Sequence, residues 1–156
     1  MVVDSQVPPE TKLVAVVEDD PELANVFREA LKREANWRLH FFFDGQEAKK
    51  RLPELGAHLI LLDVGLPNLD GASLYKILRG HSNTRHTPII VVTGSYEWEL
   101  QRMGLQTALL LRKPFQIREL LLMMHALLGG TPVEGALDAN PLAQDVVGGN
   151  ENSGKG

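Results

Sequence analysis

The sequence places six side chains that could do chemistry directly at the ends of short apolar runs: Glu18, Asp19, Asp20, Asp63, Thr93 and Lys113. Four of the six are carboxylates, and carboxylates held close together repel one another and bind protons more tightly. A bound divalent cation removes that penalty. Oxygen ligands without His or Cys select a hard ion, and a site that keeps several water ligands suits magnesium. The residue types therefore predict an acidic cluster that binds magnesium.

A carboxylate cluster, a hydroxyl and an ammonium together match the needs of phosphoryl transfer, which depends mainly on positioning and on neutralising charge. A carboxylate can attack phosphorus, magnesium and the ammonium can neutralise the phosphoryl oxygens, and the hydroxyl can bind one of them. Taken singly, each residue has an ordinary explanation as a helix cap, a strand end or a surface lysine. Their joint occurrence at four separate strand ends favours an active site.

The elements that must position these groups are five short apolar runs, at residues 13–17, 37–43, 59–62, 89–92 and 108–111. Several runs are continuous rather than alternating, as expected of strands buried on both faces. Apolar residues at helical spacing lie at about residues 23–31, 48–52, 74–78, 100–103 and 117–128. Asp20 is the predicted N-cap of the first helix, and Pro21 its first residue. This alternation predicts an α/β fold in which functional groups collect at the carboxyl ends of parallel strands.

Four motifs carry a resemblance to a known family: VVEDD at residues 16–20, LLDVGLP at 61–67 with the Asp-Gly pair at 70–71, VVTG at 91–94 and KPF at 113–115. In their order and spacing they resemble the response-regulator receiver domain of two-component signalling. The resemblance covers about residues 11 to 129. It implies a flavodoxin-like (βα)5 fold, in which a doubly wound, five-stranded parallel sheet has the strand order 2-1-3-4-5.

The resemblance also assigns roles to residues of this chain. It implies that Asp63 is the phosphoacceptor, that Thr93 hydrogen-bonds the phosphoryl group and that Lys113 pairs with it. It further implies that Mg²⁺ is bound by Glu18, Asp19 and Asp63 and by the backbone carbonyl of Gly65, with Glu18 acting largely through water. The peptide bond between Lys113 and Pro114 is expected to be cis.

Composition divides the chain into three segments. Residues 1–10 are a predicted N-terminal extension, residues 11–129 the receiver domain, and residues 130–156 a disordered tail or linker that is rich in Gly, Asn, Asp and Pro. The net charge of -4 argues against nucleic acid as a direct partner. The most apolar stretch, at 120–128, is too short to span a bilayer, and the chain lacks cysteine, so we expect a cytoplasmic protein that does not bind membranes.

The leading interpretation is a signalling domain, not an enzyme, that takes a phosphoryl group from a sensor histidine kinase or a phosphotransfer protein. Phosphorylation would then change its binding to an output protein that the sequence does not identify. The alternative is a pseudo-receiver, an interaction module that works without phosphorylation. A third interpretation, a phosphatase with an aspartate nucleophile, would need a second Asp two residues after the first, where this chain has Gly65.

Two departures from the family concern the signalling surface. The position three residues before Lys113 usually holds an aromatic switch ring but is Leu110 here, and the usual Gly-Ala-Asp stretch is replaced by residues 106–108. The apolar face of 120–128 is wider than one buried stripe needs. Together with the family's use of this face, it motivates the hypothesis of a homodimer through the fourth and fifth helices.

Overall fold

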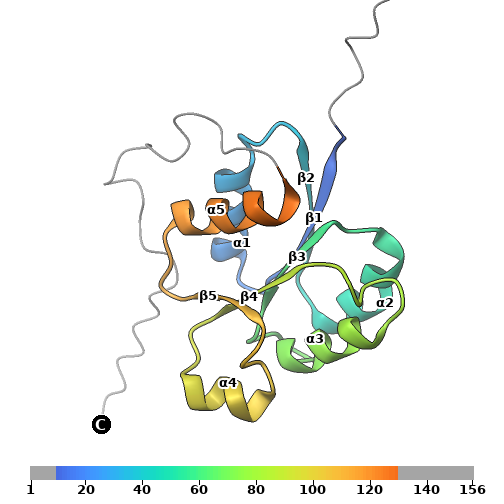
Figure 1. The fold of residues 1–156 in the computed structure, drawn as a ribbon, viewed down its shortest axis with the longest axis vertical. Helices are drawn as coiled ribbons and strands as arrows, with labels where there is room; N and C mark the ends of the chain where they lie inside the picture. Colours follow the sequence, from blue (N-terminus) through green and yellow to red (C-terminus); the bar gives the residue numbers. More distant parts are fainter. Residues whose placement is uncertain (1–9, 130–156) are drawn as a thin grey trace, which may run out of the picture.

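Strands and helices alternate along residues 10–129, the part of the chain described by the computed structural model (Figure 1). The predicted tail and all of the predicted N-terminal extension except Glu10 lie outside these residues. The elements are β1 (Lys12–Val17), α1 (Pro21–Leu31), β2 (Trp37–Phe42), α2 (Gly45–Leu55), β3 (Leu59–Asp63), α3 (Gly71–Gly80), β4 (Ile89–Thr93), α4 (Glu97–Met103), β5 (Leu109–Arg112) and α5 (Ile117–Leu128).

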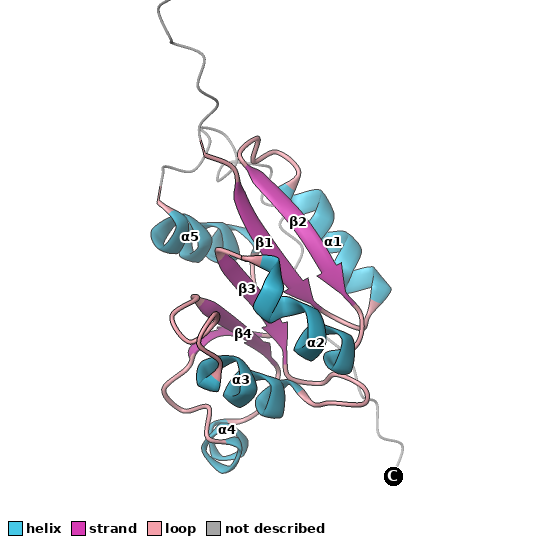
Figure 2. Cartoon of the chain, turned by 90° about the vertical axis from the view of Figure 1, so that its right-hand side faces the viewer, coloured by secondary structure: helices cyan, strands magenta, loops and turns pink. Residues whose placement is uncertain are grey.

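The five strands form one parallel sheet in the order β2-β1-β3-β4-β5, which confirms the predicted fold class and strand order (Figure 2). All strands therefore end at the same edge of the sheet. The central strands β3 and β4 are buried along their whole length. This explains why their sequences are continuous apolar runs rather than alternating ones.

Helices cover both faces of the sheet, α1 and α5 on one face and α2, α3 and α4 on the other (Figure 1). Because successive side chains of a strand point to opposite faces, Val14 and Val16 of β1 pack with α1 and α5, whereas Ala15 and Val17 pack with α2 and α3. Both layers exclude water from the sheet, so the polar groups at the strand ends are held on a rigid base.

Short polar side chains fix where the helices begin. Asp20 caps α1 by accepting a hydrogen bond from the Glu22 amide, as predicted, and Pro21 is the first helical residue. Asp44 and Asp70 cap α2 and α3 in the same way. The second helix is longer than the sequence pattern indicated, with eleven residues, because its exposed turns carry charged side chains instead of an apolar stripe.

A buried polar pair joins the end of α5 to the turn after α1. The His125 Nε2 atom lies 3.0 Å from Glu34 Oε1, and both side chains are 7% exposed. The Trp37 ring covers the imidazole with a centroid distance of 4.6 Å. Within residues 10–129, no helix is long and apolar enough to cross a membrane.

Candidate functional site

The candidate site lies at the edge where the strands end. β3 ends on Asp63 itself and β4 ends on Thr93, while Glu18 follows β1 directly and Lys113 follows β5. Backbone bonds hold these ends in line: the Lys113 amide donates to the Thr93 carbonyl at 2.8 Å, and the Glu18 amide donates to the Phe42 carbonyl at 2.9 Å. Four strand ends that are far apart in the sequence therefore present their side chains together.

Three carboxylates form a compact cluster. Glu18, Asp19 and Asp63 each offer an oxygen atom, and these oxygens lie within 4.8 Å of one another. Glu18 and Asp63 are buried, at 1% and 7% exposure, whereas Asp19 is exposed to solvent. The cluster therefore has a buried base and an open side through which an ion could enter.

The raised pKa of Glu18 and its unpaired oxygen indicate that the cluster lacks a compensating cation. Burial, and after it the negative charge of Asp63, raises the pKa of Glu18 to about 8, although the Asp20 amide and Lys113 act in the opposite direction. Its Oε1 atom accepts a bond from the Asp20 amide at 3.1 Å. Its Oε2 atom is buried and has no hydrogen-bond partner in the described part of the chain. A cation at this position would satisfy the orphaned oxygen and relieve the repulsion.

Asp63 also lies close to a cation of the protein. The Lys113 Nζ atom lies 3.4 Å from Asp63 Oδ1, and the two side chains are 20% and 9% exposed. The Gly65 amide approaches the same oxygen at 3.4 Å. Both distances exceed those of ordinary hydrogen bonds. The Asp63 carboxylate is thus surrounded by donors without being tightly held, and the bond between Lys113 and Pro114 is cis, as predicted.

Thr93 completes the set of predicted side chains. It is 1% exposed at the end of β4, and its Oγ1 atom accepts a hydrogen bond from the Ser95 amide at 2.9 Å. Within residues 10–129, the Thr93 hydroxyl acts only as an acceptor and its proton makes no hydrogen bond. Thr93 could therefore donate to a new acceptor placed beside Asp63.

The loop after β3 is held by contacts that the sequence analysis did not identify. Gly71 packs so closely that a Cβ atom would lie 2.2 Å from the Asp63 carbonyl oxygen. Asn68 adopts a left-handed conformation, with φ of 64°, and its side-chain amide donates to Asp44. That bond is the main cause of the lowered pKa of Asp44. The Asn-x-x-Gly pattern at 68–71 is typical of a turn, but the bond from Asn68 to the helix cap at residue 44 has no local sequence signal.

The structure brings most of the predicted site residues together, and Leu110 lies apart from them. Glu18, Asp19, Asp63 and Lys113 are brought into one cluster, and Thr93 lies at the adjacent strand end. Gly65 lies in the loop beside Asp63 with its amide toward the carboxylate. Leu110, at the position of the usual switch ring, is half-buried and packs against the core under α3 and α4.

Known proteins with similar sequences have the same kind of domain. The sequence model of the response regulator receiver domain matches residues 14–125. The transcriptional regulatory protein SrrA of Staphylococcus aureus is 32% identical over 136 residues, which are 86% of this chain and 55% of that protein. The chain therefore spans about half the length of the curated relatives it matches.

The chain is also similar in fold to solved structures of receiver domains. The receiver domain of sensor histidine kinase PA1611 from Pseudomonas aeruginosa PAO1 is 30% identical, with a TM-score of 0.69 over 77% of this chain and 99% of that chain. That structure has a magnesium ion coordinated in its active-site cleft. The signal receiver domain of a response regulator from Bermanella marisrubri is also 30% identical, with a TM-score of 0.66 over 77% of this chain and 100% of that chain.

Proposed function

Because the chain belongs to the response regulator receiver domain family, a family of signalling domains rather than classical enzymes, we propose that it is a switch controlled by phosphorylation of Asp63. One juxtaposition supports this proposal above all others. The Asp63 carboxylate lies within 4.8 Å of two other carboxylates, and its Oδ1 atom lies 3.4 Å from the ammonium of Lys113. A nucleophilic carboxylate flanked by a cation-binding cluster and a fixed positive charge is suited to phosphoryl transfer.

The reaction proceeds by attack of one Asp63 oxygen on phosphorus. A new oxygen–phosphorus bond forms, and the bond from phosphorus to the nitrogen of a donor phosphohistidine breaks, so that the nitrogen retains the electron pair. The product is an acyl phosphate on Asp63. Lys113 pairs with the phosphoryl oxygens, and the Thr93 hydroxyl donates a hydrogen bond to one of them, since these oxygens are acceptors.

The residues present fit a magnesium ion, as the orphaned oxygen of Glu18 and the all-oxygen donor set indicate. Glu18, Asp19 and Asp63, with the carbonyl of Gly65, would hold it. When bound, the ion would neutralise charge on the phosphoryl group and on the cluster itself. We propose a sensor histidine kinase or a phosphotransfer protein as the donor, and the cytoplasm as the place where transfer occurs.

The output of the switch is a change in partner binding, and α4 with its flanking segments is the proposed surface. Tyr96 and Trp98 are 70% and 57% exposed, and a pocket of about 370 Å³ lies between Trp98 and Met103. Leu109 on β5 and Leu122 on α5 are also exposed. A homodimer through α4 and α5 would cover such apolar groups, and light scattering with and without a phosphate analogue tests for it.

The central experiment is incubation with acetyl phosphate and magnesium, followed by intact-mass measurement. We expect one phosphoryl adduct on the natural chain and none on Asp63→Asn. Asp20→Asn is the matched control, because it also removes one acidic charge next to the cluster while Asn still caps α1. An adduct that persists on Asp63→Asn would contradict the assignment. A natural chain that binds neither magnesium nor phosphoryl would instead be a pseudo-receiver.

A further inference from the structure

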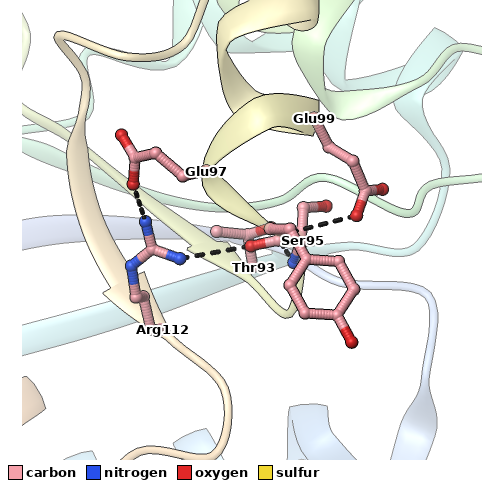
Figure 3. A network of polar contacts seen from close by, with 6 residues as sticks. Thr93, Ser95, Glu97, Glu99 and Arg112 are labelled. Carbon is pink, nitrogen blue, oxygen red and sulfur yellow. Dashed lines mark hydrogen bonds and ion pairs between the residues drawn. The ribbon is translucent and has the colours of Figure 1, made fainter.

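Ser95, in the loop between β4 and α4, is held through both of its backbone polar groups. Its amide donates to Thr93 Oγ1 at 2.9 Å, and its carbonyl accepts a bond from Arg112 Nη1 at 3.2 Å (Figure 3). The other guanidinium nitrogen, Nη2, lies 2.6 Å from Glu97 Oε2, in the first turn of α4. One residue of β5 thus ties both the loop and the helix to the sheet.

Arg112 sits between the site and the α4 surface. It is the last residue of β5, directly before Lys113, and it is the register partner of Thr93 on β4. The contacts run from the Thr93 hydroxyl to Ser95, from Ser95 to Arg112, and from Arg112 to Glu97. This role has no signal in the sequence, where the fifth apolar run ends at residue 111, one residue before Arg112.

From this chain of contacts we infer that Arg112 is a positioning residue that holds the β4–α4 loop and α4 in the resting arrangement, and that is released when Asp63 is phosphorylated. This inference rests on the proposed function. Turning the Thr93 side chain to donate to a phosphoryl oxygen withdraws Oγ1 from the Ser95 amide. The loop then rearranges to satisfy that amide, and the Ser95 carbonyl and Glu97 leave Arg112.

Release of Arg112 would couple the site to the α4 surface in a chain that has Leu110 in place of the aromatic switch ring. Leucine is apolar and remains packed against the core, so it has no polar group that could exchange partners between two states. Arg112 has five donors in a fixed fork and contacts both the loop and the helix. When Arg112 is released, the backbone of the β4–α4 loop and of α4 can move, and this movement shifts the exposed side chains of Tyr96 and Trp98.

The expected effect is modest. The Arg112 and Glu97 side chains are 48% and 65% exposed, and ion pairs in contact with water contribute little. Loss of the contacts should raise the population of the released state about two- to fivefold, which tightens binding of a phosphate analogue by the same factor. High salt should have the same effect on the natural chain, because it screens the exposed pair.

The test titrates beryllofluoride, at saturating magnesium, into the full chain and follows the indole signal of Trp98 by NMR. Arg112→Ala and Glu97→Gln should both bind the analogue about two- to fivefold more tightly, and their free-state Trp98 signals should move toward the bound position. A pure charge effect predicts opposite signs, because losing a cation weakens anion binding and losing a carboxylate strengthens it. Arg51→Ala, which removes an exposed pair of similar burial on α2, is the matched control and should change neither quantity.

Unchanged or weaker analogue binding by Arg112→Ala, with an unmoved Trp98 signal, would overturn the inference. Failure of the proposed function appears differently, as a natural chain that does not bind beryllofluoride at all. In that case amide exchange of Ser95 in the free protein decides whether Arg112 holds the loop. Faster exchange in Arg112→Ala than in Arg51→Ala supports the holding role, and equal exchange refutes it.

Discussion

Gly71 packs against the backbone of Asp63, so that a Cβ atom at residue 71 would lie 2.2 Å from the Asp63 carbonyl oxygen and 2.6 Å from Val64 Cα. These obstacles are backbone atoms, which cannot rotate away. The close approach lets α3 start directly behind the end of β3. The position of the phosphoacceptor proposed here is therefore set partly by the absence of a side chain on a neighbouring helix.

Gly71→Ala should disturb both stability and the site. We expect the free energy of unfolding to fall by about 2 kcal/mol or more, as in other overpacked cores, with loss of adduct formation from acetyl phosphate. Gly80→Ala, at the other end of α3, is the control, since its added Cβ would meet no described atom within 4 Å apart from its chain neighbours and its own helix backbone. It should leave stability unchanged or raise it by up to about 1 kcal/mol. Equal behaviour of the two variants in urea denaturation would contradict this account of Gly71.

The metal-free protein should lose stability as pH rises. Burial and Asp63 raise the pKa of Glu18 from 4.5 to about 8, so between these values the folded chain keeps a proton that the unfolded chain has released. The free energy of unfolding then falls with rising pH, by at most about 1.4 kcal/mol per unit.

Urea denaturation in EDTA from pH 5 to 8 measures this slope. Glu18→Gln should remove most of it, whereas Glu22→Gln, in the first turn of α1, should not. Saturating magnesium should flatten the slope of the natural chain, because the ion takes the place of the proton. A natural chain whose stability does not change over this range would show that Glu18 is ionised throughout.

Asp19→Asn should weaken magnesium binding by about tenfold or more, because it removes both a charge and a carboxylate ligand from the cluster. The melting temperature of the metal-free chain should rise slightly as repulsion decreases. Asp20→Asn loses the same charge one residue further along but lies outside the cluster, and it serves as the comparison. If calorimetric titration gives the two variants the same magnesium affinity, the assignment of Asp19 fails.

His125→Leu should be strongly destabilising, because it leaves the buried Glu34 carboxylate without its partner. The expected loss is about 3 kcal/mol, against about 0.5 kcal/mol or less for Arg51→Ala, which breaks an exposed pair. The double variant Glu34→Met with His125→Leu should recover much of that loss, since it removes both polar groups. A double variant as unstable as the single one would indicate damaged packing instead of an unpaired carboxylate.

Removal of residues 130–156 should leave the fold intact. This segment has few aliphatic side chains and no aromatic ones, too little apolar surface to offset the entropy of ordering it. The truncated chain should melt within a few degrees of the full chain in a calorimetric scan. A much lower melting temperature would show that the segment packs against the domain.

Sequence patterns predicted the layers of this fold well because the apolar pattern of each strand and helix shows which of its faces is buried. The continuous runs of β3 and β4 and the Asp20-Pro21 start of α1 are local features, and they reappear in the structure at nearly the predicted residues. The convergence of Glu18, Asp63 and Lys113 then followed from the topology of a parallel sheet. The family motifs supplied their roles, which remain to be tested.

Contacts between polar residues that lie far apart in the sequence could not be predicted in this way. Glu34 and His125 are 91 positions apart, and neither stands in a pattern that points to the other. Asn68 and Asp44 each have a local explanation, as turn and cap, that conceals their bond to one another. Arg112 resembles any surface arginine until the register of β4 and β5 places it opposite Thr93.

Because of the strand order β2-β1-β3-β4-β5, the site forms only when most of the sheet has folded. Its three carboxylates come from the ends of β1 and β3, while Thr93 comes from β4 and Lys113 follows β5, so no single hairpin-sized fragment contains the site. Every parallel pairing must close a long loop before these groups meet, which makes their assembly a late and cooperative event. A chain whose β5 has not yet been synthesised would lack Lys113, and the proposed phosphorylation site would stay incomplete until the whole sheet had formed.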